Sequence, residues 1–177
     1  MATIERPENT EYSSYYRGYV ERVPDGDVLD LLAEQTGVLD SMLEPLSDEQ
    51  ARYRIAPEEW SIKEVVGHLV DAERTFAYRA FAFSRGESGE LPSMEQDEYV
   101  QEGHFDDWSL SEMLEELGML RKANLIAFRH LTPEACLRHG VASGIDVSVR
   151  ALVYILAGHF DYHIEDLTEK YLPGLAA

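Results

Sequence analysis

Residues 149–167 read VRALVYILAGHFDYHIEDL, and this stretch decides the fold. Apolar side chains recur along it with the three- and four-residue spacing of one helix face: Val149, Leu152, Val153, Leu156, Phe160, Ile164 and Leu167. Asp146 or Ser148 can cap the start of this helix, and Pro173-Gly174 marks its end. The pattern predicts a long amphipathic helix that buries its apolar face in a protein core.

His159 and His163 lie four residues apart near the middle of this apolar face. Their rings are therefore expected to point into the core, about one helical turn apart. An unpaired buried polar group costs about 1–3 kcal/mol, so each imidazole needs a partner. Two interpretations stay open: each ring hydrogen-bonds to a carbonyl or carboxylate oxygen, or both bind one metal ion.

Three further segments show helical periodicity, at about residues 27–43, 61–84 and 109–131. Asp27 can cap the first of them. A Trp-Ser-x-x-Glu start predicts a capping box with a tryptophan staple at Ser61–Glu64 and again at Ser109–Glu112. No segment shows strand-like alternation of useful length. The sequence therefore predicts an all-α, four-helix bundle that occupies a single domain, residues 1–177.

The segments outside these helices carry two further expectations. Residues 86–108 form a long acidic connection between the second and third helices, suited to a crossover or a substrate cover. Its acidity disfavours an anionic substrate nearby. Residues 1–24 are expected to form an N-terminal extension that packs on the bundle or on a partner subunit through Tyr12, Tyr15, Tyr16 and Tyr19.

Composition excludes several classes of function. The formal net charge is −19, from 34 acidic and 15 basic residues, so nucleic acid is not expected as a partner. Cys136 is the single cysteine, which excludes an internal disulfide and a thiolate cluster. No run of about 18 apolar residues and no signal peptide are present, so we expect a cytoplasmic protein without a membrane partner.

A third histidine, His68, lies on the flank of the apolar face of the second helix. Three neutral imidazoles would leave an open position on a zinc-like ion, as in catalytic sites. Glu73 lies nearer the centre of that face and could orient an imidazole, move a proton or pair with a buried arginine. Asp71, one turn from His68, is the other candidate carboxylate. The spacing of His104, His130 and His139 does not suggest ligation, and they are left out of the site.

The sequence resembles the DinB/YfiT-like superfamily. The resemblance begins with residues 60–74, WSIKEVVGHLVDAER, and Tyr78-Arg79-Ala80, which are similar to its second helix. Residues 91–92 and 97–100 resemble the loop that follows in one branch. Residues 147–152, together with Gly158-His159 and His163, resemble its last helix, so the similarity extends over nearly the whole chain.

The resemblance implies a four-helix bundle in which His68, His159 and His163 bind one divalent metal ion: zinc first, with nickel or manganese as alternatives. It implies a homodimer and an enzyme acting on a small-molecule substrate. Some members transfer a low-molecular-weight thiol such as bacillithiol or mycothiol or act as a maleylpyruvate isomerase, and others are labelled hydrolases. One departure is Phe160, where many members carry an acid; here the acid follows at Asp161.

The function is therefore expected to be that of a metal-dependent enzyme with a three-histidine site, with S-transferase-like or hydrolase-like activity. The alternative is a stress-response module that binds a metal or small ligand without turnover. A third interpretation is a structural dimer whose core histidines are satisfied by hydrogen bonds. A fixed fourth protein ligand would mark a non-catalytic metal site, and an exchangeable position would mark an enzyme.

Overall fold

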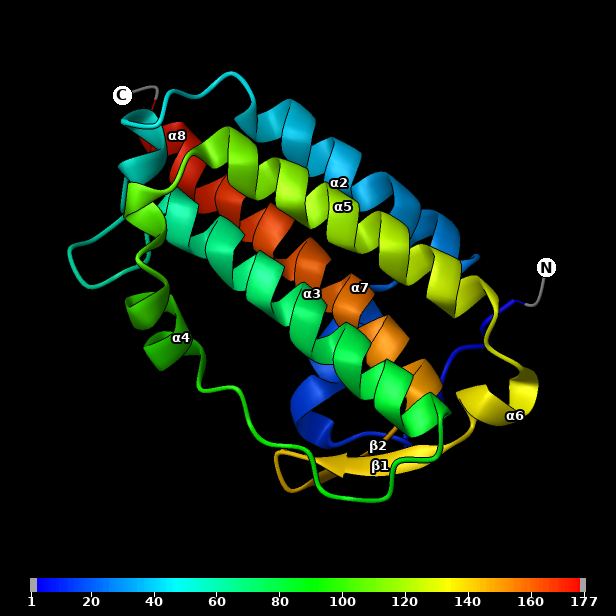
Figure 1. Ribbon diagram of the computed structural model, residues 1–177. Helices are drawn as coiled ribbons and strands as arrows, with labels where there is room; N and C mark the ends of the chain where they lie inside the picture. The colour runs from blue at the N-terminus through cyan, green and yellow to red at the C-terminus, as the bar shows by residue number, and fades with distance from the viewer. Residues whose placement is uncertain (1–2, 176–177) are drawn as a thin grey trace.

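A computed structural model describes residues 3–175 and shows four long helices packed side by side (Figure 1). They are α2 (Val28–Leu43), α3 (Ile62–Ser84), α5 (Leu110–Arg129) and α7 (Val149–Asp166). Each long helix packs against two of the others, and the apolar faces meet in a shared core. The predicted four-helix bundle is confirmed. Within residues 3–175, no helix is both long and apolar enough to cross a membrane.

Shorter elements cover the ends and one side of the bundle. They are η1 (Ser14–Tyr16), α1 (Arg17–Arg22), η2 (Gln50–Arg52), α4 (Gln96–Gly103), η3 (Phe105–Asp107), α6 (Pro133–Cys136), β1 (His139–Ala142), β2 (Ile145–Ser148), η4 (Leu167–Tyr171) and α8 (Leu172–Leu175).

The long helices do not simply alternate in direction. Figure 1 shows α3 and α5 running the same way, with α2 and α7 running the opposite way. Two parallel helices need a crossover, and residues 85–109 provide it. The predicted long connection is present, and it contains the short helices α4 and η3. Val100 and Phe105 are buried, so two apolar anchors fix an otherwise acidic segment to the bundle.

A short hairpin, which the sequence did not predict, adds to the helical bundle. β1 and β2 form an antiparallel hairpin with Ala142 opposite Ile145, across one end of the bundle (Figure 1). Its turn residues, Ser143 and Gly144, both have positive φ, at 56° and 70°, which is the backbone of a type I′ turn. Strands of four residues are too short to show alternation in the sequence.

The N-caps predicted from the sequence are present at three of the four long helices. Asp27, Ser61 and Ser148 cap α2, α3 and α7, and Ser61 forms the full capping box with Glu64. The capping box predicted at Ser109 does not form. The Leu110 N–H instead donates to Asp48 at 2.8 Å, and the Ser109 hydroxyl pairs with that of Ser111. A carboxylate from a distant loop therefore replaces the local cap.

The N-terminal segment packs on α7. Its carboxylate Glu11 is buried and accepts hydrogen bonds from the Ser148 hydroxyl, at 2.7 Å, and from the Arg150 guanidinium. Further along, α1 lies against the middle of α7. Tyr19 is partly buried there, whereas Tyr15 is 71% exposed. The segment thus joins the start of α7 to the region of His159.

Glu11 gives the stability a predictable dependence on pH. Burial alone would raise its pKa, but the hydrogen bonds from Arg150, Glu8 N–H and Ser148 outweigh it and hold the pKa at about 2, below the ordinary 4.5. A lowered pKa stabilises the fold above pH 4.5, and this contribution is lost as the pH falls from 4.5 toward 2. Glu11→Gln should cost about 3 kcal/mol at pH 7, because it breaks a buried ion pair.

Urea unfolding between pH 3 and 7 measures this effect. The decrease in the free energy of unfolding caused by Glu11→Gln should become smaller as the pH falls. Glu5→Gln is the matched control, because Glu5 also faces Arg150, at 3.5 Å, but its side chain is 85% exposed. Equal losses for the two variants at pH 7 would show that the Glu11 pair contributes no more than a surface pair.

Candidate metal centre

Three buried histidines converge between α3 and α7. His68 Nε2 lies 3.0 Å from His159 Nε2, and His163 Nε2 lies 3.2 Å from the same atom. One nitrogen from each ring lies within 4.8 Å of the other two. The residues are 2%, 6% and 8% exposed. The structure therefore brings together the three residues that the sequence singled out.

Two glycines allow close packing beside these histidines. A Cβ atom on Gly67 would come within 2.3 Å of the Phe105 ring, and one on Gly158 within 1.8 Å of the Tyr19 carbonyl oxygen. Each glycine directly precedes a histidine of the cluster. The crossover and α1 can therefore pack directly on the helical turns that carry His68 and His159.

Aromatic side chains surround the cluster. The Trp60 ring lies 4.9 Å from that of His68, and the Tyr19 ring lies 5.3 Å from that of His159. Phe76 packs on His159 at 5.9 Å, and Tyr162 packs on His163 at 5.1 Å. These rings hold the imidazoles in place and limit their access to water. Trp60 was predicted only as a helix staple, so its contact with His68 is an addition.

Burial keeps the three imidazoles neutral at pH 7. It lowers the pKa of His68 to about 3 and that of His163 to about 4, with the charge of His163 adding to the effect on His68. The pKa of His159 falls well below its ordinary value for the same reason, with smaller contributions from His163 and His68. A neutral imidazole keeps a lone pair for a metal ion.

The spacing of the nitrogens also fits a metal ion. Metal–nitrogen bonds of about 2.0–2.1 Å place neighbouring ligands roughly 2.9–3.4 Å apart, from octahedral to tetrahedral geometry. Two of the three separations, 3.0 and 3.2 Å, lie in this range, and all three nitrogens lie within 4.8 Å of one another. Hydrogen bonds between the rings also fit these distances.

Among residues 3–175, His159 Nδ1 is the one fully enclosed side-chain N or O atom without a hydrogen-bond partner.

The two candidate carboxylates lie in different surroundings. Glu73 is 0% exposed and accepts hydrogen bonds from Arg121, at 2.8–3.1 Å, and from Asn124, at 2.8 Å. Of the roles predicted for Glu73, the structure shows the pairing with a buried arginine. Asp71 is half-buried, and burial raises its pKa. A proton-transfer role for either residue stays a prediction.

Sequence reasoning missed the rest of the Glu73 network. Arg121 Nη1 donates to the Leu32 carbonyl and the Gln35 side chain, so α2, α3 and α5 meet at one guanidinium. Gln35 Nε2 in turn donates to the Ala157 carbonyl, at 2.8 Å, and to Asp161, at 2.7 Å. Those two residues flank His159 on α7. Gln35, a polar residue in an apolar stripe, was the available signal.

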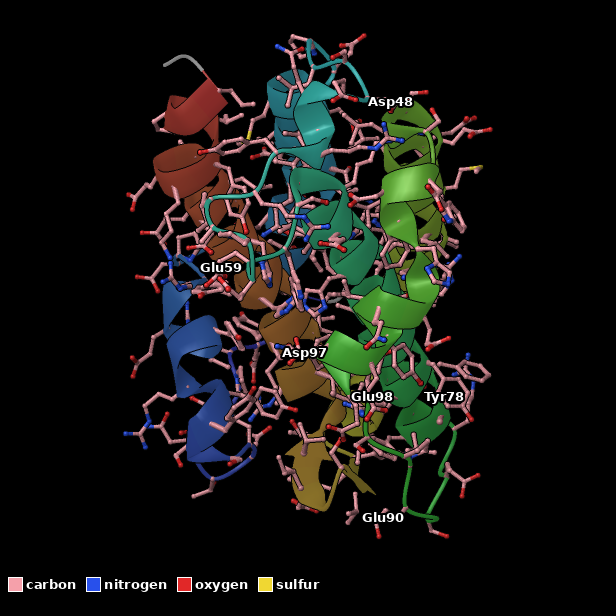
Figure 2. The ribbon with its side chains drawn as sticks, turned by 90° about the vertical axis from the view of Figure 1, so that its left-hand side faces the viewer. Asp48, Glu59, Tyr78, Glu90, Asp97 and Glu98 are labelled. Carbon is pink, nitrogen blue, oxygen red and sulfur yellow. The ribbon has the colours of Figure 1, made fainter. Side chains whose placement is uncertain are left out.

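Two cavities reach the histidines, and Tyr15, Tyr19 and Gln96 line both of them. The first, the acidic cavity, has a volume of about 330 Å³ and includes His163 and four carboxylates: Glu58, Glu59, Asp97 and Asp166. Figure 2 shows Glu59 and Asp97 on the same side of the bundle, where α4 lies. The second, the arginine cavity, measures about 80 Å³ and includes His68, His159 and Arg79. Both give a small molecule access to the cluster.

Comparison with known structures identifies the fold. YfiT from Bacillus subtilis, described as a probable metal-dependent hydrolase with an unusual four-helix bundle topology, matches with a TM-score of 0.72 at 18% identity, over 84% of this chain and 88% of that one. A mycothiol-dependent maleylpyruvate isomerase matches with a TM-score of 0.67 at 13% identity, over 84% of this chain and 62% of that one. At these identities the likeness concerns the fold alone.

Sequence comparison identifies the family. No curated protein sequence matches the chain significantly. The family model of the DinB superfamily matches residues 31–167, a range that contains all four long helices except the first turn of α2 and includes the three clustered histidines. The chain therefore belongs to the DinB superfamily.

Proposed function

We propose that the protein is a metal-dependent enzyme in which His68, His159 and His163 bind one divalent ion. The observation that carries this proposal is the convergence of three buried, neutral imidazoles. Zinc suits three nitrogen ligands and is the first choice, with nickel and manganese as alternatives. The homodimer and the cytoplasmic location expected from the sequence stay predictions.

The proposed reaction is thiol transfer to a small electrophile, with hydrolysis as the alternative. A bound ion with an open position would lower the pKa of a thiol or a water molecule at that position. Thiol use is favoured by analogy with the mycothiol-dependent isomerase, and hydrolysis by analogy with YfiT. The aromatic side chains around the cluster would limit competing water, and the two cavities suit a small molecule.

Tyr19 is suited to orient a bound molecule, because it lines both cavities. Burial raises its pKa to about 12, and the nearby tyrosines Tyr15, Tyr162 and Tyr16 add to the rise. Its hydroxyl therefore stays protonated and serves as a hydrogen-bond donor. Glu73 is already paired with Arg121, which leaves Asp71 as the freer of the two carboxylates for proton transfer.

Cobalt substitution tests for an exchangeable position. Adding 2-mercaptoethanol to the cobalt-loaded protein should produce a thiolate charge-transfer band. A series of thiols, each supplied with the electrophile 1-chloro-2,4-dinitrobenzene, should reveal metal-dependent turnover. p-Nitrophenyl acetate tests the hydrolytic alternative. His163→Ala should abolish band and turnover, whereas His130→Ala, an exposed histidine outside the cluster, should retain both. Bound cobalt whose spectrum responds to neither thiol nor azide would indicate a binding module without catalysis.

A further inference from the structure

Arg79 is a buried cation in the wall of the arginine cavity. It is 5% exposed, and its Nη2 donates to the Pro92 carbonyl at 2.8 Å and to the Ser143 hydroxyl at 2.9 Å. Both acceptors are neutral. Among residues 3–175, no carboxylate forms an ion pair with Arg79. The guanidinium therefore keeps an unbalanced charge beside the histidine cluster.

The other buried cations show that this is unusual for the chain. Arg121 pairs with Glu73, Arg150 with Glu11 and Lys63 with Asp48. A buried charge normally requires such a partner, because its removal from water is costly. Burial lowers the pKa of Arg79, and the groups that oppose this effect are the phenols of Tyr16 and Tyr99. The described protein supplies no anion for this guanidinium.

Arg79 also keeps hydrogen-bond donors for a ligand. Its Nη2 makes both of the hydrogen bonds above, and the neighbouring hydroxyl of Tyr16 is a further side-chain partner for the guanidinium. Arg79 and Tyr16 both line the arginine cavity, so an anion that enters it could accept hydrogen bonds from this guanidinium. No carboxylate lines this cavity, whereas four line the acidic cavity. An anion is thus favoured on the Arg79 side alone.

Phe76 contacts both the guanidinium and the cluster. The Arg79 guanidinium carbon lies 5.9 Å from the centre of the Phe76 ring, which lies 5.9 Å from the centre of the His159 ring. His68 and Arg79 lie eleven residues apart on α3, which is roughly 16 Å of helical rise. A molecule that reaches both Arg79 and the histidines therefore needs a chain of several bonds between its two polar ends.

We propose that Arg79 forms a carboxylate-binding subsite, so that the substrate or thiol co-substrate carries a carboxylate several bonds from its reacting atom. This inference rests on the proposed function, because the reacting atom is the one that would lie at the metal ion. The expectation that the acidic crossover disfavours an anionic ligand does not extend to this cavity, because none of the carboxylates of the crossover segment lines it.

Hexanoate and 1-hexanol, which have equal chain lengths, test the subsite without turnover. In ¹⁵N-labelled protein, hexanoate should shift the Arg79 Nε–Hε resonance saturably, and hexanol should not. The resonance is assigned by its loss in Arg79→Gln. The same titration after chelator treatment should give the same shift, because the subsite does not need the metal ion. A shift in protein that binds no added zinc, nickel or manganese would support the subsite and contradict the proposed metal enzyme. No shift with hexanoate, or an equal shift with hexanol, would overturn the subsite.

A second measurement links the subsite to the cluster. Cobalt-loaded protein should bind 6-mercaptohexanoate at least about tenfold more tightly than 6-mercapto-1-hexanol, as expected for a charge-assisted hydrogen bond. Arg79→Gln should remove this preference, and Arg79→Lys should keep part of it. Arg85→Gln, which removes an exposed arginine from the end of the same helix, should leave it unchanged.

A purely structural role for Arg79 predicts a different pattern. Its bonds to Pro92 and Ser143 connect α3 to the crossover and to the hairpin turn. If it served only this purpose, Arg79→Gln would lower stability while the folded variant bound the acid and the alcohol in the parental ratio. That result would overturn the subsite, and restoration of the acid preference by lysine would support it.

Discussion

Glu73→Ala is expected to lower the free energy of unfolding by about 3–5 kcal/mol, because it leaves the Arg121 guanidinium buried without its counter-charge. Glu73 and Arg121 are 0% and 1% exposed and are joined by hydrogen bonds from Nε and Nη2. Arg121 also lies 4.7 Å from the centre of the Phe160 ring, so an aromatic group borders the guanidinium on that side. Urea unfolding at pH 7 measures the effect.

A surface pair between the same two helices provides the control. Arg74 on α3 pairs with Glu116 on α5, but their side chains are 45% and 28% exposed. Glu116→Ala should therefore change stability by only about 0–1 kcal/mol. The double variant Glu73→Leu/Arg121→Met should recover much of the loss, because it removes both buried charges. Equal losses for Glu73→Ala and Glu116→Ala would contradict the assigned role of the buried network.

Metal binding should produce the second large effect, an increase in thermal stability that depends on the cluster. Free zinc at about a thousand times its dissociation constant stabilises a folded protein by about 4 kcal/mol. The parent should show a corresponding rise in Tm. His163→Ala should show none, because two imidazoles cannot hold the ion at the same concentration.

His130→Ala provides the matched control, because it removes an exposed histidine at the end of α5. This variant should respond to zinc as the parent does. An equal rise in Tm for His163→Ala would show that zinc acts at a site other than the cluster. A chelator should reverse the rise in the parent.

Much of the helical fold could be predicted because local signals agree with the tertiary structure. Asp27 and Ser61 cap helices within a residue of the predicted starts, and the apolar stripes face the core. Val38 is an exception, since it lies at an apolar position of the predicted helix over 27–43 yet is 50% exposed. His159 and His163 could be paired from their spacing alone, because one helix fixes their geometry.

The remaining features depend on contacts between distant segments. His68 lies on the flank of its stripe, so its place in the cluster followed from the family resemblance and not from periodicity. Arg79 and Arg121 carry no local signal of burial, because an arginine on a helix is normally solvated. Asp48 replaces the expected Ser109 cap from a loop 62 residues away. Such pairings become visible only once the chain has folded.

Elemental analysis tests the central claim most directly. The protein is purified without a metal-affinity tag, beside His159→Ala/His163→Ala, and circular dichroism confirms that both are folded. The parent should contain about one equivalent of a transition metal, and the variant should contain none. A parent that holds no metal, even after incubation with zinc, nickel and manganese, would contradict the metal centre and identify the three histidines as packing residues of a helical bundle.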